Sequence, residues 1–488
     1  MISAIRRSNI FCKCFATYKG LTYEDLDKKF TENKYGQYDF PHKYKELIAM
    51  KKAEKKLIDL SSESPPWLPS ERFRFVDETI SCSLFPKLME SNSISLDAKN
   101  RANAILSSIE YGAIGAYTHS RGIEIIRQSV SDFLKERDGF GSNLNDIYLT
   151  HGISEGLITV LSLLFKDPND AIMIPDPCRP LFHSLIKLKQ GNEVRYNLNF
   201  EKGFTFDINS VEEAYYNATK ANKKIKAIII SNPSYICGKV LSEALIRNLL
   251  TFAYEKKLVV YIDESFSCAI FNNNPEFHSA RKVLHGMKDL ANKLEIFTFL
   301  STSNPLHAQY GLRGGILLSA NCQEYITEQI YKLRSICLCS NSVSQIAINL
   351  FCDPPKRGAN SDEIVDQFEN EIKFRKSQMI KGAELMYNYL NKCRGFECHT
   401  IESGLFSLPR IQIPKKIQNL CLNLKIPPDE AYCLEALKAG ILLTPGNIFS
   451  KRSNDHFIRV TNSLRSNEDN LFEENLDNLA LFNNNLFN

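Results

Sequence analysis

Six short apolar runs between residues 145 and 320 constrain the fold of this chain more than any other feature of its sequence. Each run is four or five residues long and is rich in β-branched and aromatic residues. They lie at 147–150, 171–174, 227–230, 258–262, 296–300 and 315–318. Apolar strands separated by stretches that can form crossover helices are typical of α/β proteins with a mostly parallel sheet. We therefore predict an α/β domain whose ligands bind at the carboxyl ends of the strands.

The chain is long enough for more than this one domain. Its 488 residues would make about three domains of ordinary size, or one large and one small. We expect a leader at 1–20, an N-terminal arm with part of a small domain at 21–100, a large domain at 101–365, and a small α+β domain at 366–488. Within these segments we expect helices at 43–58 and 362–393, a Pro-rich turn at 65–69, and an Asn-rich end after 466 that frays.

The beginning of the chain is basic. Residues 1–23 hold Arg6, Arg7, Lys13 and Lys19 and no acidic residue, and the first acidic residue is Glu24. An acid-poor segment with Arg, Ser and apolar residues is typical of a mitochondrial transit peptide. The sequence therefore predicts a mitochondrial protein. The alternative is a disordered basic leader on a cytoplasmic protein.

Composition excludes several other classes of protein. No apolar run reaches the ~18 residues that a membrane-spanning helix needs. The 14 cysteines are scattered without a repeating frame and have no His cluster beside them, which indicates reduced thiols and no zinc site. The Lys-rich segment 43–58 has the character of a solvated helix face, so we expect no nucleic-acid partner.

Anion-binding groups follow two of the predicted strands. Thr150-His151-Gly152-Ile153-Ser154-Glu155-Gly156 opens a helix after the first strand, where free N–H groups and the Ser154 hydroxyl can hold a phosphate. Taken alone, Ser154 could equally be a helix N-cap. Ser301-Thr302-Ser303 ends the fifth strand, and Arg313 follows in a Gly-rich turn. Asp263 ends the fourth strand, where a buried carboxylate favours a functional role.

Taken together, these motifs resemble those of the class I and II, fold-type I, pyridoxal-phosphate-dependent aminotransferases, and most closely the alanine aminotransferases. The resemblance extends from about residue 20 to 465 and implies a large domain with a mostly parallel sheet and a smaller α+β domain. It rests on Gly20-Leu21-Thr22, Gly115-Ala116-Tyr117-Thr118-His119-Ser120-Arg121-Gly122, Thr150 to Ser154, Phe277-His278-Ser279, Ser301-Thr302-Ser303, Leu312-Arg313-Gly314-Gly315, Ser407-Leu408-Pro409-Arg410 and Arg459-Val460-Thr461.

The resemblance implies a role for eight residues. The cofactor phosphate would be held by Ser154 with the amides near Ile153, by Ser301, Ser303 and Arg313, and by Tyr117 from the other subunit of a dimer. Asp263 would pair with the pyridine nitrogen and keep it protonated. Arg459 would bind the substrate α-carboxylate through a bidentate pair.

The reactive end departs from the family pattern at four positions. The lysine that forms the Schiff base belongs directly after Ser303, where this chain has Asn304, and no lysine lies between Lys293 and Lys332. Tyr235 and Phe266 replace the asparagine and the tyrosine that hydrogen-bond the cofactor's phenolic oxygen. Arg179 replaces the aromatic ring that stacks on the pyridine.

These departures predict a catalytically degenerate homologue, because an asparagine has no proton to shuttle near neutral pH. Such a protein would serve in mitochondria as a homodimer or as a subunit of a larger assembly, or would bind a phosphate ligand. Pyridoxal phosphate would then bind non-covalently at best. The alternative is an active alanine:2-oxoglutarate-type aminotransferase, or a lysine-independent pyridoxal-phosphate enzyme in which His307 moves the proton.

Overall fold

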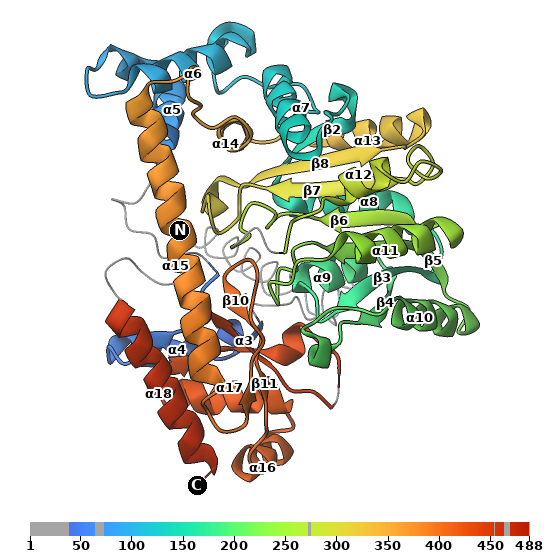
Figure 1. Ribbon diagram of the computed structural model, residues 1–488, viewed down its shortest axis with the longest axis vertical. Helices are drawn as coiled ribbons and strands as arrows, with labels where there is room; N and C mark the ends of the chain where they lie inside the picture. Colours follow the sequence, from blue (N-terminus) through green and yellow to red (C-terminus); the bar gives the residue numbers. More distant parts are fainter. Residues whose placement is uncertain (1–38, 64–72, 272–274, 453, 463–468, 488) are drawn as a thin grey trace, which may run out of the picture.

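The computed structural model describes residues 39–63, 73–271, 275–452, 454–462 and 469–487. At its centre is a seven-stranded sheet with the order β2-β8-β7-β6-β5-β3-β4 (Figure 1). Only β8 runs antiparallel to its neighbours, so the predicted α/β fold with a mostly parallel sheet is confirmed. The strands are β2 Ile147–His151, β3 Asp170–Asp176, β4 Asn192–Asn197, β5 Lys224–Ser231, β6 Val259–Asp263, β7 Ile296–Ser301 and β8 Gly314–Ala320.

Both faces of the sheet are covered, which explains why its strands are continuously apolar. In β3, Ala171 and Met173 face one apolar cluster and Ile172 and Ile174 face another. One face packs against α8 Gly152–Leu164, α9 Pro180–Leu188 and α13 Glu324–Ile336. The other packs against α10 Ile208–Lys220, α11 Glu243–Glu255 and α12 Ala280–His285, and nearer β2 and β8 against α7 Glu124–Asp138 and α14 Ser342–Cys352.

The strand β4 was missed by the sequence prediction. It lies at the edge of the sheet, where only Val194 and Tyr196 of its six residues are buried. An edge strand alternates polar and apolar side chains, so it produces no continuous apolar run.

A second group of elements follows the sheet domain and is joined to it by one long helix. Helix α15 Asp362–Leu390 runs from the neighbourhood of α14, α5 Arg74–Leu84 and α6 Leu96–Ser107 to the lower half of the molecule (Figure 1). The domain boundary expected at 365 falls inside this helix.

The lower half has its own apolar cluster, which contains residues of α15, of the segment 40–60 and of α18. Its helices are α3 Asp39–Lys43, α4 Lys45–Ala53, α16 Lys415–Leu424, α17 Pro428–Lys438 and α18 Asp469–Phe487. Its short strands are β1 Ile58–Asp59, β9 Phe396–Glu397, β10 Phe406–Ser407, β11 Arg410–Ile411, β12 Ile441–Leu442, β13 Thr444–Pro445 and β14 Ile458–Thr461.

Two predictions for this half need correction. The helix expected at 43–58 ends at Ala53, and the chain then enters β1, which pairs with β12. The end of the chain, which was expected to fray, forms α18 instead. Phe472, Leu476, Leu479 and Leu486 are buried along one side of that helix, and this apolar stripe holds it against the lower cluster.

Other expectations lie outside the described residues: the leader at 1–20, Gly20-Leu21-Thr22 and the Pro-rich turn at 65–69. No helix among the residues that the structure describes is long and apolar enough to cross a membrane.

Candidate functional site

The register of the sheet brings the predicted site residues to one edge. Ser231 at the end of β5 pairs with Asp263 at the end of β6, and Asp263 pairs with Phe299 of β7. At the other side, Ser301 pairs with Gly315 of β8. The carboxyl ends of these neighbouring strands therefore form a single rim, as expected for an α/β sheet.

The start of α8 lies against Arg313. Gly152 has a φ of +73°, and a Cβ there would lie 2.5 Å from Nη2 of Arg313. A Cβ on Gly315 would lie 2.4 Å from the carbonyl carbon of Gly152. Both positions need glycine because the two backbones and the guanidinium approach so closely. The result is a helix N-terminus with a guanidinium directly beside it.

The hydroxyls predicted to bind a phosphate belong to α8 and to the segment that ends β7. Ser301 Oγ donates to the carbonyl of Gly314 at 3.1 Å and accepts from the Ser303 amide at 2.9 Å. Ser154 is the third residue of α8, whose N-cap position is occupied by His151, so the N-cap alternative for Ser154 is wrong. Among the described residues, the Arg313 guanidinium has no hydrogen-bond or ion-pair partner. Ser154, Ser301, Ser303 and Arg313 therefore fit a phosphate group.

A carboxylate that the sequence reasoning missed also lies at this helix start. Glu155 Oε2 accepts from the amide of His151 at 2.5 Å, and its Oε1 lies 2.6 Å from Nη1 of the buried Arg334. Its negative charge favours the N-terminus of α8. The signal was present in the sequence, because Glu155 stands four residues after His151 in the helix-opening motif.

Beside this cup, Arg179 pairs with Asp263. Nη1 of Arg179 lies 3.3 Å from Oδ2 of the buried Asp263, whose Oδ1 accepts from the amide of Ser265 at 3.0 Å. The guanidinium of Arg179 also lies 4.2 Å from the centre of the Tyr235 ring. Burial lowers the pKa of Arg179. The charges of Asp263, Tyr235 and Glu63 together raise it by more than burial lowers it, so the net shift is upward. Arg179 therefore stays charged and forms an ion pair with Asp263, the carboxylate expected to pair with a pyridine nitrogen.

Aromatic rings fill the space next to this ion pair. The ring centre of Tyr235 lies 5.0 Å from that of Phe266 and 5.4 Å from that of Phe406. Phe266 is buried and packs closely against Gly404, where a Cβ would lie 3.1 Å from the Phe266 ring. The three substituted positions Arg179, Tyr235 and Phe266 thus form one packed group with Asp263.

Asn304 is fully buried and both ends of its amide are used. Its Nδ2 donates to the carbonyl of Ser301 at 2.9 Å, and its Oδ1 accepts from the amide of His307 at 2.9 Å. The side chain closes the turn that follows β7. It offers no amine and no titratable proton toward the rim of the sheet.

The environment of His307 disfavours its protonated form. Burial, and after it the positive charge of Arg375, lowers the pKa of His307 to about 3. Its ring packs edge-on against Phe351 with 4.8 Å between centres. A general base is most effective when its pKa lies near the working pH, and this histidine is far below neutrality.

Arg459 is buried and bound by its own chain. Nη2 donates to the carbonyl of Ser61 at 2.9 Å and to Thr444 Oγ1 at 3.3 Å, and Nη1 forms an ion pair with Glu63. The ring of Phe406 lies 4.3 Å from the guanidinium. Glu63 was not singled out from the sequence, because it stands 396 positions from Arg459.

Tyr117 is not brought to the phosphate cup of its own chain. Its side chain is 75% exposed, and its neighbour Thr118 accepts from Gln345 of α14 at 3.0 Å. Exposure leaves Tyr117 accessible to another subunit, where the resemblance predicts that it acts.

The residues present fit pyridoxal phosphate only in part. The cup around Arg313 suits the phosphate, since it supplies hydroxyls, a helix start and a guanidinium that has no partner among the described residues. The other half of the site does not suit the pyridine ring, because Arg179 is paired with Asp263 and packed on Tyr235. No amine stands at position 304. We therefore derive no reaction step through this cofactor.

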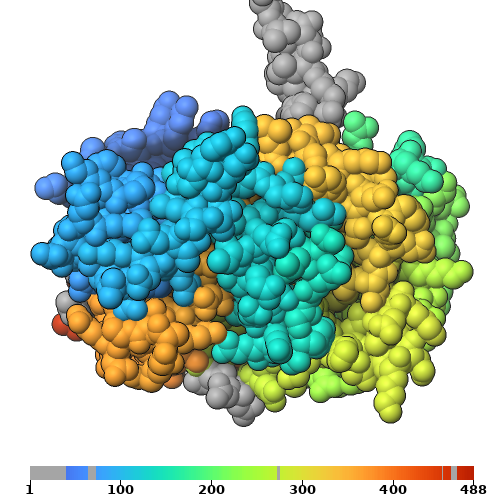
Figure 2. All heavy atoms as spheres, turned by 90° about the horizontal axis from the view of Figure 1, so that it is seen from above, coloured from blue at the N-terminus to red at the C-terminus, as the bar shows by residue number. Residues whose placement is uncertain are grey.

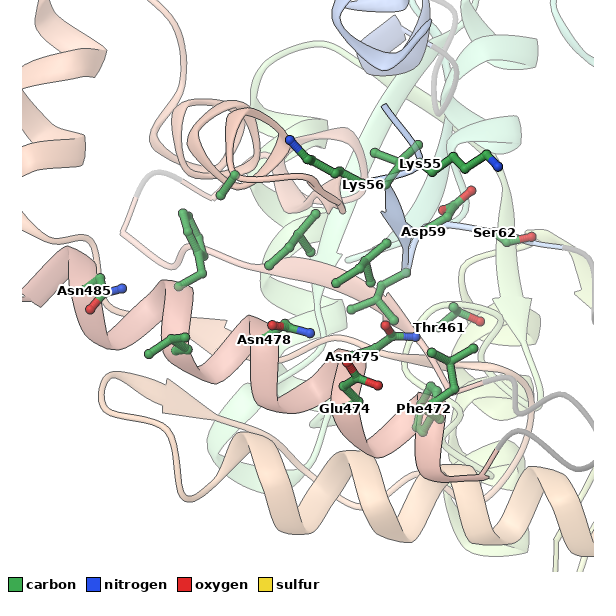
Figure 3. A pocket seen from close by; sticks show the side chains of 18 residues that line it. Lys55, Lys56, Asp59, Ser62, Thr461, Phe472, Glu474, Asn475, Asn478 and Asn485 are labelled. Atoms are coloured by element: carbon green, nitrogen blue, oxygen red, sulfur yellow. The ribbon is translucent and has the colours of Figure 1, made fainter. Parts of the chain in front are cut away.

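A cavity of about 860 Å³ is lined by none of the predicted site residues. Figure 3 shows it between β1 and α18, with Lys55, Asp59, Asn475 and Asn478 on its walls. Ser62 and Thr461 line it and are the sequence neighbours of Glu63 and Val460, so the cavity borders the strand that carries Arg459.

Comparison with known proteins gives consistent results. The family model described as aminotransferase class I and II matches residues 87–472. A probable mitochondrial alanine aminotransferase of Dictyostelium discoideum is 32% identical over 80% of this chain and 73% of its own. Glutamate–glyoxylate aminotransferase 2 of Arabidopsis thaliana is 30% identical over 91% of this chain and 92% of its own. The structure of an alanine aminotransferase from Pyrococcus furiosus, 18% identical, covers 94% of this chain and is itself covered completely (100%), with a TM-score of 0.71.

Proposed function

The chain belongs to the aminotransferase class I and II family, and from that premise we propose that it is a catalytically degenerate member. One observation carries the proposal: Asn304 stands where the family's Schiff-base lysine is expected, and its amide is committed to the turn after β7. Without that lysine the chain lacks both the covalent attachment and the group that shuttles the proton.

The ion pair of Arg179 with Asp263 supports the same proposal. A protonated pyridine nitrogen needs a free carboxylate opposite it. Here a guanidinium of permanent charge takes that carboxylate. A buried carboxylate without a partner destabilises the folded chain, so the ion pair with Asp263 stabilises Arg179 in this position.

We further propose that the protein is retained as a structural or assembly subunit in mitochondria. Relatives from Dictyostelium discoideum and Arabidopsis thaliana are named as mitochondrial alanine aminotransferases. The basic, acid-free residues 1–23 support the same compartment.

A homodimer is the form of assembly that the surface supports. Large apolar side chains of the sheet domain are exposed at Tyr111, Tyr117, Ile336 and Leu338. The segment that carries Tyr117 lies on α13, because His119 stacks on Tyr331 at 5.6 Å between ring centres. In Figure 2 the teal region that includes α7 lies next to the gold region that includes α13 on the face shown. Exposed apolar patches of this kind are typical of protein–protein contacts.

Non-covalent binding of a phosphate compound is the second candidate function. It is favoured by the Arg313 guanidinium, which has no partner among the described residues and lies beside the start of α8. Titration calorimetry with pyridoxamine phosphate tests it, with Arg313→Gln as the comparison. A dissociation constant far above millimolar for the unaltered protein would argue against this function.

An exchange assay separates degeneracy from the enzymatic alternatives. Purified protein is incubated with pyridoxal phosphate, alanine and labelled 2-oxoglutarate. We expect exchange at the level of the protein-free control. An active aminotransferase or a lysine-independent enzyme instead predicts exchange above background that equals the exchange of the Asn304→Lys variant. A lysine-independent route through His307 would also be lost in His307→Gln.

A further inference from the structure

Glu63 places a carboxylate of the chain itself at the guanidinium of Arg459. The pair joins a residue next to β1 with a residue of β14. Arg459 is only 2% exposed, whereas the Glu63 side chain is 25% exposed. Because one partner is enclosed and the other reaches water, Glu63 is the side chain that can leave.

Arg459 is held in place by groups other than Glu63. Its Nη2 is bound by the Ser61 carbonyl and Thr444 Oγ1. The rings of Phe406 and Phe449 lie 4.3 and 5.3 Å from the guanidinium. The arginine therefore keeps its position when its carboxylate partner changes, as a preformed anion site does.

Glu63 does not occupy every hydrogen-bond donor of the Arg459 guanidinium. The ion pair involves Nη1, while the buried Nε has no hydrogen-bond partner among the described residues. The hydroxyl of Tyr310 is also buried and lacks a partner within the described part of the chain. Burial comes first among the causes that raise the pKa of Tyr310, and the charges of Tyr235 and Glu63 follow. The Nε of Arg459 and the hydroxyl of Tyr310 are therefore two buried donors without a partner among the described residues, which costs free energy.

Charge counting in this cluster indicates what a replacement ligand must be. Arg179 and Arg459 carry two positive charges, and Asp263 and Glu63 carry two negative charges. The cluster is neutral with Glu63 inside and has one uncompensated positive charge when Glu63 leaves. A single carboxylate restores neutrality, and a dicarboxylate overshoots it.

We propose that Glu63 is an internal ligand of the Arg459 anion site and that it competes there with small free monocarboxylates. The carboxylate of such a ligand takes the place of the Glu63 carboxylate and can also reach the unsatisfied Nε. Ser62 lines the cavity of about 860 Å³, so open space borders the backbone that carries Glu63 (Figure 3).

The proposal rests on the proposed function only through the assignment of Arg459 as the carboxylate-binding arginine. It needs neither pyridoxal phosphate nor any statement about position 304. Its failure would leave the loss of the lysine untouched, and activity in the exchange assay would not overturn it.

Propionate binding to the full chain without cofactor tests the proposal by titration calorimetry. Glu63→Gln removes the competing charge and should bind propionate at least about tenfold more tightly than the unaltered protein, the factor expected for losing one competing ion pair. Glu363→Gln is the matched control, because the Glu363 side chain is 83% exposed, and it should bind propionate as the unaltered protein does. Succinate should bind the Glu63→Gln variant more weakly than propionate does, because its second carboxylate exceeds the single positive charge left in the cluster.

Two further variants keep the test decisive. Glu63→Asp retains the charge but shortens the side chain, so it should fold even where Glu63→Gln does not, and it should also bind propionate more tightly than the unaltered protein. Adding Arg459→Gln to either variant should abolish the gain. Unchanged propionate affinity in Glu63→Asp and Glu63→Gln, or a gain that survives Arg459→Gln, would overturn the proposal.

Discussion

The arginine at position 179 changes what the buried carboxylate of Asp263 can do. Asp263 lies at the carboxyl end of β6, where a ligand would be expected, yet its nearest cation belongs to the same chain. Asn304 shows the same change at the end of β7, where an amide closes a turn. Both side chains therefore bind other groups of the same chain, as the proposed loss of catalysis requires.

The contribution of His307 to stability should depend on pH. Its pKa in the folded chain is about 3, below the roughly 6.5 of an unfolded histidine. As the pH falls below 6.5, the unfolded chain takes up a proton that the folded chain does not, so the folded state loses stability until the pH approaches 3. Between pH 6.5 and pH 5 the free energy of unfolding of the His307→Gln variant should therefore fall by about 1.5 kcal/mol less than that of the unaltered protein.

Urea denaturation at a series of pH values measures this difference. Above pH 7 the two proteins should show parallel curves, which serves as the internal control. Equal losses of unfolding free energy below pH 6.5 would show that His307 is protonated in the folded chain, and would reopen its role as a proton carrier.

The positions of the site residues in the fold could be predicted from the sequence, but their ion-pair partners could not. Ser301 and Asp263 were expected at the carboxyl ends of strands and Arg313 in the turn that follows β7, and they lie there because β-strand register follows from the apolar pattern. The ion pairs could not be predicted, since Arg179 and Asp263 are 84 positions apart and Arg459 and Glu63 are 396 apart. Such contacts depend on how packed elements meet in space.

At the scale of elements, the central sheet was predictable and its edges were not. Each apolar run became a strand, because burial on both faces demands continuous apolar residues. The edge strand β4 and the final helix α18 were missed. In α18 the Asn-rich and acidic composition obscured an apolar stripe at helical spacing, which is visible once Phe472, Leu476 and Leu479 are compared.

Helix α18 should contribute strongly to stability. Leu479 is 0% exposed in the lower cluster, and removing its buried methyl groups leaves a cavity. We expect Leu479→Ala to lower the free energy of unfolding by about 2–5 kcal/mol. Leu481, which is 61% exposed on the same helix, is the matched control, and Leu481→Ala should cost less than about 1 kcal/mol. Equal effects in urea denaturation would mean that α18 is not part of the folded core.

At the scale of the whole molecule, the account predicts a dimer formed through the face around α13. Ile336 is 77% exposed at the end of that helix. A charged residue there would be buried without a partner in a dimer interface, so Ile336→Asp should weaken the dimer by about 100-fold. Leu422 on α16 is also 77% exposed, and Leu422→Asp should leave the dimer intact.

Sedimentation equilibrium of the two variants and the unaltered protein decides this point. A monomeric unaltered protein, or equal dissociation by both substitutions, would show that the apolar face around Ile336 is not the contact between copies.

The central claim is that the family's covalent chemistry is absent from this chain, and chemical trapping tests it most directly. The protein is incubated with pyridoxal phosphate, reduced with borohydride, digested and mapped by mass spectrometry, with an active alanine aminotransferase treated in parallel. We predict that no single lysine of this chain is labelled stoichiometrically, while the active enzyme is labelled at its Schiff-base lysine. One equivalent of label on one lysine of this chain would contradict the account.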